Sequence, residues 1–254
     1  MKNLQLSVFL PAYNEEENIK KTIFNIDRVL KEICQDYEIL VVNDGSHDQT
    51  GQIVRNLSKE NKKIRLINHS KNKGYGGAIK SGLYNVRYPW VVQIDSDGQF
   101  DFIEIKKLLA KKDKADLIIG YRIKRTDNLY RQFMAKMLWL ADFILFGLNV
   151  RDVDCGFKLF KKKIIDTIPK LKTQSAITIT EFVVRAKIAG FKVVQVGVHH
   201  HSREKGEQTG GKPSIIIKAA FQGIILWFYL GLPSVILKFF LVILKAKPEG
   251  SQPK

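Results

Sequence analysis

Two aspartates one residue apart, Asp95 and Asp97, are the side chains whose type and spacing suggest chemistry most directly. They follow the short apolar run Val91–Ile94 and precede Gly98, a pattern typical of a buried strand that ends in a turn. Residues i and i+2 of a strand project to the same side, so both carboxylates can face one point. Such oxygens suit Mg²⁺ or Mn²⁺. The motif predicts a metal site; the alternative is a pair of solvated turn aspartates.

Other short motifs carry weaker signals. Asp44 ends a second apolar run beside Gly45, as a residue that reads a ribose or a base edge would, although turns carry Asp and Gly for local reasons too. The glycine-rich stretch 74–77 matches neither standard phosphate-binding pattern, so helix packing is its favoured interpretation. The three histidines 199–201 alternate faces along an extended segment, which argues against a shared metal ion.

An alternation of apolar runs and amphipathic segments must position these side chains. The predicted strands are Leu4–Leu10, Glu38–Val42, Ile64–Ile67, Trp90–Ile94, Leu117–Ile119 and Lys192–Val198. The predicted helices are Asn14–Ile33, Asp48–Leu57, Gly74–Leu83, Phe102–Leu109, Leu129–Phe146 and Thr180–Ala189. This order indicates an α/β fold with a Rossmann-like, mainly parallel sheet flanked by helices.

Three polar clusters fall at the carboxyl ends of predicted strands, namely Pro11–Glu15, Asn43–Ser46 and Asp95–Asp97. In doubly wound sheets ligands bind beyond these ends, because the loops that follow parallel strands meet at one edge. We therefore expect the three clusters to form one active site.

The chain carries 42 Lys and Arg against 25 Asp and Glu, a net charge of +17. Nucleic acid, an anionic membrane surface or a polyanionic substrate would each suit this charge, but no RNA- or DNA-binding signature accompanies it. Arg203, Lys205 and Lys212 lie in a glycine-rich segment that either closes over substrate phosphates or is a solvated basic loop. Cys34 and Cys155 make no disulfide framework, which fits a reducing compartment.

The C-terminal segment is strongly apolar. Residues 219–237 form an uncharged window of 19 residues, which Gly231, Leu232 and Pro233 interrupt. Two helices lying in a membrane interface therefore fit better than one clean span, although a span stays open. We expect a globular domain over residues 1–212 and a helical, membrane-associating tail over residues 213–254, with an anionic bilayer surface as its partner.

Taken together, several of these stretches resemble family 2 glycosyltransferases with the GT-A fold: Val8–Glu16, Val42–Ser46 and Asp95–Gln99. Further stretches look like the branch that transfers sugars to dolichyl or polyprenyl phosphate: Asn72–Ala78, Asp154–Phe160 and His200–Gly206. The resemblance covers residues 4–212. It implies an inverting, metal-dependent enzyme that moves a sugar from a UDP- or GDP-sugar to polyprenyl phosphate, at the cytoplasmic face of the cell membrane.

The resemblance also implies roles for individual residues. The nucleoside would be held by Pro11, Tyr13, Glu15, Val42 and Asp44. The diphosphate would be flanked by Asp95, Ser96 and Asp97, and the metal would be bound by Asp95, Asp97 and Gln99. Donor or acceptor phosphate would meet Arg122 and Arg203. The family has a Lys where this chain has Thr209, and Lys212 is the candidate replacement.

Whether the transfer reaction needs a general base depends on the chemical nature of the acceptor. A phosphate acceptor is already ionised at neutral pH, so it needs none. If the acceptor were a glycan or glycolipid hydroxyl, Asp152 or Asp154 would be the candidate base, and both are also candidates for a structural role in their loop. A non-catalytic binding module is the remaining alternative, and the intact pair Asp95 and Asp97 argues against it.

Overall fold

The computed structural model describes residues 4–123, 129–203, 205 and 213–231, with the backbone alone for 129–135 and 213–220. Its centre is a seven-stranded sheet in the order β3-β2-β1-β4-β6-β5-β7. The strands are β1 (Gln5–Ala12), β2 (Asp36–Asn43), β3 (Ile64–Asn68), β4 (Trp90–Gln93), β5 (Leu117–Arg122), β6 (Lys158–Lys161) and β7 (Val193–Val198). All neighbouring strands pair in parallel except β6, which is antiparallel to β4 and to β5.

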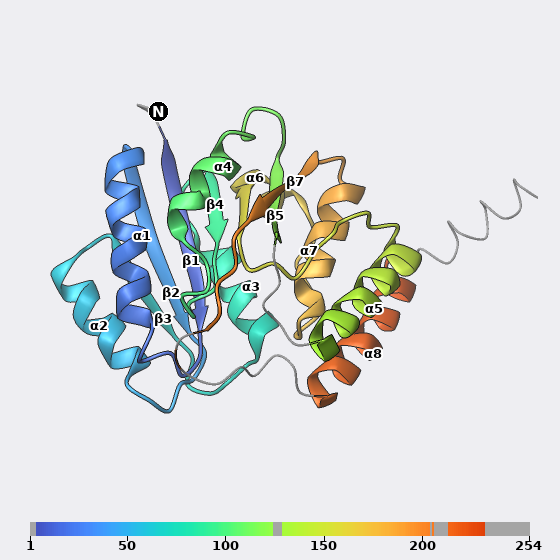
Figure 1. Ribbon diagram of the computed structural model, residues 1–254, viewed down its shortest axis with the longest axis horizontal. Helices are drawn as coiled ribbons and strands as arrows, with labels where there is room; N and C mark the ends of the chain where they lie inside the picture. The colour runs from blue at the N-terminus through green and yellow to red at the C-terminus, as the bar shows by residue number, and fades with distance from the viewer. Residues whose placement is uncertain (1–3, 124–128, 204, 206–212, 232–254) are drawn as a thin grey trace, which may run out of the picture.

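Helices cover both faces of this sheet (Figure 1). They are α1 (Ile19–Ile33), α2 (Thr50–Glu60), α3 (Tyr75–Asn85), a 3₁₀ turn η1 (Phe102–Glu104), α4 (Ile105–Leu109), α5 (Leu129–Phe146), α6 (Lys162–Thr167), α7 (Ile177–Ile188) and α8 (Pro213–Tyr229). One core cluster joins the sheet to α1, α2, η1 and α4, and a second joins it to α3, α6 and α7. The predicted α/β fold with a mainly parallel sheet is confirmed.

The strands β1 and β2, at the centre of the parallel region, are buried on both faces. After their first residue, β1 and β2 are buried along their whole length. Near-continuous apolar runs of this kind are typical of parallel strands covered by helices on both sides. The two strands therefore hold the loops that follow Ala12 and Asn43 in a fixed place.

Two local predictions are wrong. The helix predicted from Asn14 begins at Ile19, because Asn14 adopts a left-handed φ of 54° and bonds to the loop after β2 instead of capping a helix. The strand β6 was not predicted, because its four residues, Lys158–Lys161, have Lys at both ends and show no alternation. Lys158 is nevertheless fully buried, so only its tertiary partners reveal the strand.

The C-terminal region is described as far as Gly231. Within the described residues, no helix combines the length and the hydropathy needed to cross a bilayer. The side chain of Gln222 on α8 accepts hydrogen bonds from Gln174 N and Ser175 Oγ, so α8 packs against the start of α7. In Figure 1, α8 lies beside α5 at one end of the molecule. Residues 232–254, and with them most of the predicted second apolar piece, lie outside the described residues.

Candidate active site

The loops after β1, β2 and β4 meet at one edge of the sheet, as predicted. Ser96 Oγ donates to the carbonyl of Pro11 at 2.8 Å, which ties the loop after β4 to the end of β1. Thr22 Oγ1 on α1 donates to the carbonyl of Ser96 at 3.2 Å. Ser96 is thus a buried anchor that fixes the backbone between the two flanking aspartates.

Asp95 is contacted by residues from both halves of the chain. Tyr75 Oη, at the start of α3, donates to Asp95 Oδ1 at 3.2 Å. A Cβ added to Gly156 would lie 1.9 Å from Asp95 Oδ2, so only glycine allows this approach. Burial, reinforced by the neighbouring charge of Asp97, raises the pKa of Asp95 well above its usual range, while the buried ammonium of Lys158 opposes the rise.

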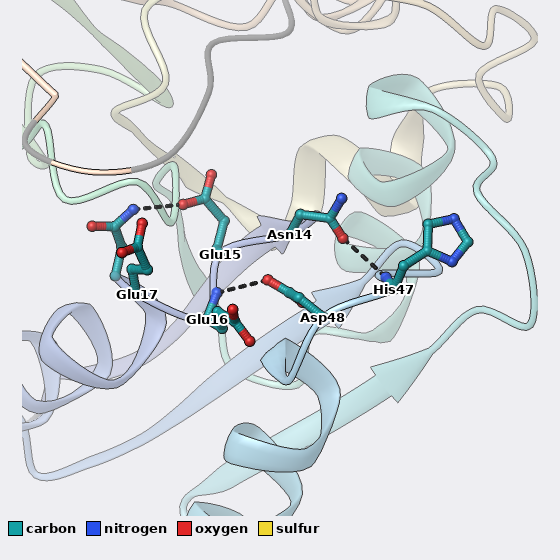
Figure 2. Close-up of a pocket in the computed structure, with 7 residues that line it drawn as sticks. Asn14, Glu15, Glu16, Glu17, His47 and Asp48 are labelled. Atoms are coloured by element: carbon teal, nitrogen blue, oxygen red, sulfur yellow. Dashed lines mark hydrogen bonds between the residues drawn. The ribbon is translucent and has the colours of Figure 1, made fainter.

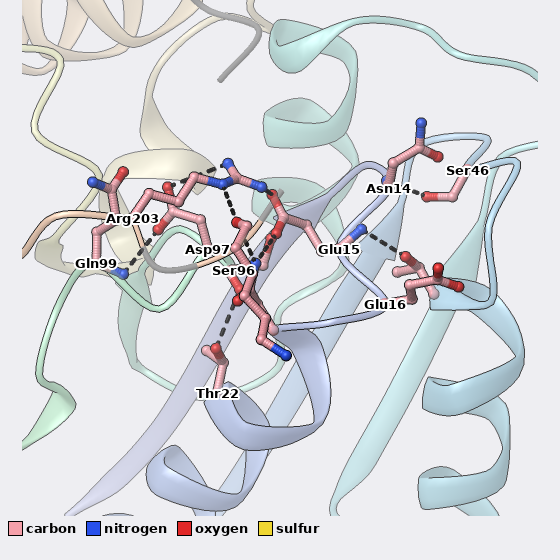
Figure 3. Close-up of polar contacts among 12 residues, drawn as sticks. Asn14, Glu15, Glu16, Thr22, Ser46, Ser96, Asp97, Gln99 and Arg203 are labelled. Atoms are coloured by element: carbon pink, nitrogen blue, oxygen red, sulfur yellow. Dashed lines mark hydrogen bonds and ion pairs between the residues drawn. The ribbon is translucent and has the colours of Figure 1, made fainter. Parts of the chain in front are cut away.

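Asp97 faces a cationic side chain that comes from far along the chain (Figure 3). Arg203 Nη2 donates to Glu15 Oε1 at 2.8 Å, and its Nη1 lies 4.0 Å from Asp97 Oδ2. The Arg203 side chain is 10% exposed, so this charge cluster is largely withdrawn from water. Burial raises the pKa of Asp97, and the Gln99 N–H and the Arg203 charge partly offset that rise.

Gln99 connects this loop to the segment that carries Arg203. Its Nε2 donates to the carbonyl of His201 at 2.9 Å, and His201 N donates to the carbonyl of Gln99 at 2.9 Å. The amide nitrogen of Gln99 therefore positions the 199–203 segment. His199 N donates to Glu104 Oε2 at 2.9 Å, and His199 Nδ1 contacts the other oxygen of the same carboxylate.

Arg122 and Asp152 form a paired unit. Arg122 Nε and Nη2 donate to the two Asp152 carboxylate oxygens, each at 2.7 Å, and the backbone N of Arg122 donates to Oδ2 at 3.2 Å. Both oxygens of Asp152 are therefore engaged, which suits orientation of the guanidinium better than proton abstraction. Asp154 is half-buried in the same loop, close enough to raise the pKa of Asp142.

The candidate nucleoside residues lie at the ends of β1 and β2. Asp44 is 3% exposed, and its Oδ1 contacts His69 Nδ1 at 2.6 Å and accepts from Lys73 N at 2.9 Å. Tyr13 lies half-buried, with its ring edge-on to His47. Val42 has no exposed surface, so it supports the site from within the sheet.

A hollow of about 390 Å³ opens beside these loops (Figure 2). Its lining is acidic, with Glu15, Glu16, Glu17 and Asp48. Glu16 N donates to Asp48 Oδ2 at 3.0 Å, so the loops after β1 and β2 are joined. Repulsion within this lining favours a bound cation or a basic partner such as Arg203.

The donor set of the aspartate loop fits a hard divalent cation. Asp95 and Asp97 supply oxygen ligands at one strand end, the Oδ1 of Asp97 accepting from Gln99 N at 3.1 Å. In the described part of the chain, no three or more His, Cys, Asp or Glu side chains gather into a metal cage. Two carboxylates with open positions are the donor set that Mg²⁺ and Mn²⁺ use when phosphate oxygens complete the shell.

Four residues near the site were missed by sequence reasoning. Tyr75, Gly156 and Lys158 were seen only as parts of motifs, and Asp142 only as part of an apolar helix. Asp142 is 3% exposed, and burial, then the charge of Asp154, raises its pKa to about 7. One acidic residue within an otherwise apolar helix was the available signal. Lys212 lies outside the described residues.

The chain is similar to several known proteins. A family profile described as glycosyl transferase family 2 matches residues 7–168. Dolichyl-phosphate beta-glucosyltransferase ALG5D of Trichomonas vaginalis is 34% identical over 62% of this chain and 53% of its own length. Undecaprenyl-phosphate 4-deoxy-4-formamido-L-arabinose transferase of Salmonella choleraesuis is 29% identical over 80% of this chain and 62% of its own. The chain thus spans between half and two thirds of the length of these curated relatives.

Solved structures show the same fold. Glucosyl-3-phosphoglycerate synthase from Mycobacterium tuberculosis, in complex with Mn²⁺, uridine diphosphate and glucosyl-3-phosphoglycerate, superposes with a TM-score of 0.67. The two chains are 18% identical, and the match covers 88% of this chain and 79% of that one.

Proposed function

The chain belongs to glycosyltransferase family 2, and on that premise we propose that it transfers a sugar from a nucleotide-sugar donor to a polyprenyl phosphate. The observation that carries the proposal is that Asp95 and Asp97 lie together at the carboxyl edge of the sheet and that Arg203 Nη1 lies 4.0 Å from Asp97 Oδ2 there. Two carboxylates and a guanidinium at one point can bind a metal-chelated diphosphate, and the curated relatives act on dolichyl or undecaprenyl phosphate.

The nucleotide would lie over the ends of β1, β2 and β4. Asp44, oriented by His69 and by Lys73 N, would meet the base or the ribose, with Tyr13 and Pro11 beside it. Asp95 and Asp97 would hold Mg²⁺ or Mn²⁺, with Gln99 as a further candidate ligand. A bound divalent cation would supply Lewis-acid stabilisation of the charge on the departing nucleoside diphosphate.

The chain's own cations would complete that stabilisation. Arg203 lies against Asp97, so its guanidinium would meet the negative charge that builds on the leaving diphosphate. Arg122, oriented by Asp152, is the candidate partner of the acceptor phosphate. A phosphate oxygen attacks the anomeric carbon from the face opposite the leaving group, so the carbon is inverted. Because that oxygen is already ionised, the engagement of Asp152 by Arg122 does not obstruct the reaction.

The exposed apolar face of α5 and α8 supports a membrane-bound acceptor. Large side chains on α5 and α8 that are more than a third exposed are Met137, Trp139, Leu140, Phe143, Ile144, Phe221, Ile224, Ile225, Phe228 and Tyr229. The two helices lie side by side in Figure 1, so these side chains belong to one end of the molecule. With a net charge of +17, such a face suits an anionic bilayer surface, and we place it on the cytoplasmic side, whose leaflet carries the anionic lipids.

The test is a transfer assay with purified protein, Mn²⁺ or Mg²⁺, polyprenyl phosphate and a panel of labelled UDP- and GDP-sugars. We expect label to move into the organic phase and the transfer to stop when EDTA is added. Donor hydrolysis without lipid labelling would contradict the proposal that the acceptor is polyprenyl phosphate. It would favour a hydroxyl acceptor, with Asp154 as the candidate base. Absence of donor binding would contradict the proposal as a whole.

A further inference from the structure

A second hollow, of about 800 Å³, lies apart from the acidic one and has the opposite character. It runs between α3 and the segment before α7. We call it the lysine groove, and its lining includes Lys71, Lys73, Lys80, Ser81, Lys170 and Gln174. No acidic residue lines it. Four lysines therefore line one concave surface, and no acidic side chain is among its lining residues.

These lysines differ from other lysines of the sheet region. Lys161 and Lys162 are paired with Asp116 and Asp166, each at 2.8 Å. Among the residues that the structure describes, none of the four groove ammonium groups forms an ion pair. The acidic group that acts electrostatically on Lys80 is Glu181, which is already bound to Arg185 Nε at 2.8 Å. Four unpaired like charges repel one another, so an anion in the groove would relieve that repulsion.

Buried hydrogen bonds link the lysine groove to the candidate donor site. Ser81 Oγ, on the groove wall, contacts His69 Nε2 at 2.8 Å, and His69 Nδ1 contacts Asp44 Oδ1 at 2.6 Å. Lys73 reaches the same carboxylate, because its backbone N donates to Asp44 Oδ1 at 2.9 Å. A ligand that engages Ser81 or Lys73 therefore acts on groups that orient Asp44.

The groove also lies beside α8. Gln174 is a lining residue, and its backbone N donates to Gln222 Oε1 on α8 at 3.3 Å. The neighbouring side chain of α8, Phe221, is 65% exposed. A charged headgroup at a bilayer against α8 would thus meet the lysine groove at its rim.

From these observations we propose that the lysine groove is a second anion-binding site, which takes a ligand with two or more phosphate charges. The site is distinct from the pair Asp95 and Asp97, and it does not depend on the transfer reaction proposed above. The phosphate comes either from a lipid headgroup at the bilayer against α8 or from a soluble phosphate compound. Both sources offer the same chemistry to the four ammonium groups.

Calorimetric titration with inorganic tripolyphosphate tests the proposal. EDTA and the Asp97→Asn substitution are used throughout, so that the donor site does not bind the probe through a metal. We expect Lys80→Ala with Lys170→Ala to weaken binding at least about tenfold, because two charge-assisted contacts are lost. The matched control is Lys59→Ala with Lys114→Ala, two exposed lysines elsewhere, which removes the same charge and leaves binding within about twofold. Thermal unfolding reports that each variant is folded.

Equal weakening by both pairs, or no measurable binding of tripolyphosphate to the parent protein, would overturn the proposal. Sedimentation with cardiolipin and phosphatidylcholine vesicles identifies the source of the phosphate, because the cardiolipin headgroup carries two phosphates. If the groove pair lowers binding to cardiolipin vesicles several-fold more than the control pair does, the ligand is a lipid headgroup. If the two pairs lower vesicle binding equally while only the groove pair lowers tripolyphosphate binding, the ligand is soluble.

Discussion

The two halves of the molecule contribute to the site in different ways. The N-terminal half, β1–β4 with α1–α3, places carboxylates at the ends of adjacent parallel strands. The C-terminal half, β5–β7 with α5–α7, places Gly156, Lys158 and Arg203 against those carboxylates through antiparallel β6 and through the segment after β7. The first half thus supplies negative charge, and the second supplies the close packing and the cations that control it.

The contrast between the carboxylates of one half and the cations of the other explains how the buried carboxylates of the site are stabilised. Asp95 and Asp97 are both withdrawn from water, and burial raises both of their pKa values, so the two negative charges are costly at this place. The charges of Lys158 and Arg203 oppose these rises. Variants in the two halves should therefore fail in different ways.

The largest effect is expected from the N-terminal half. Asp97→Asn removes a candidate metal ligand without removing volume, so transfer should fall by at least roughly 10²–10³-fold while the circular dichroism spectrum is retained. Asp113→Asn, at a side chain 84% exposed, is the matched control and should leave transfer unchanged. Full activity in a folded Asp97→Asn protein would contradict the assignment of Asp97 as a metal ligand.

A substitution in the C-terminal half should reach the same carboxylates indirectly. Gly156→Ala places a methyl group 1.9 Å from Asp95 Oδ2, so the carboxylate must move. We expect Mn²⁺ affinity, measured by electron paramagnetic resonance titration, to fall roughly 10- to 100-fold. Gly223→Ala is the control, since its added Cβ would meet Ile177 only at 3.5 Å. Unaltered Mn²⁺ affinity in Gly156→Ala would show that the position of Asp95 does not matter for the metal.

The contact that joins the halves should have a smaller effect. Arg203→Lys keeps the charge but loses the fork that reaches Glu15 and Asp97 together. We expect kcat/KM for the donor to fall about tenfold, with a corresponding loss in donor affinity. Arg55→Lys, on the exposed face of α2, is the control and should leave kcat/KM for the donor unchanged. If Arg203→Lys matched the parent enzyme in steady-state kinetics, the guanidinium would act as a simple charge.

The smallest effect concerns stability and its pH dependence. Burial raises the pKa of Asp142 from its usual 3.8 to about 7, so folding takes up a proton between these pH values and stability falls as the pH rises from about 4 to about 7. Asp142→Asn removes this dependence. It should raise the free energy of unfolding at pH 8 by on the order of 1–3 kcal/mol, and by little at pH 4. Denaturant titrations at both pH values measure the difference, and an equal change at both would exclude titration of Asp142 as its cause.

Much of the N-terminal half could be predicted because its signals are local. Apolar runs marked β1, β2, β3 and β4 within about two residues, and the polar residues after them had to meet because parallel strands share one carboxyl edge. The start of α1 was misplaced because Asn14 bonds to Ser46 and His47 instead of capping a helix. Capping signals cannot report a partner 32 residues away.

The amino-acid sequence by itself determined the α/β class, the family and the aspartate loop, since each depends on residues that are neighbours in the chain. Only the tertiary structure decided that Lys158 is buried in a strand, that Gly156 lies against Asp95, that Asp152 is bound to Arg122 and that four lysines form one groove. These features depend on contacts between distant segments and on the withdrawal of charges from water. Neither quantity is encoded in the order of nearby residues.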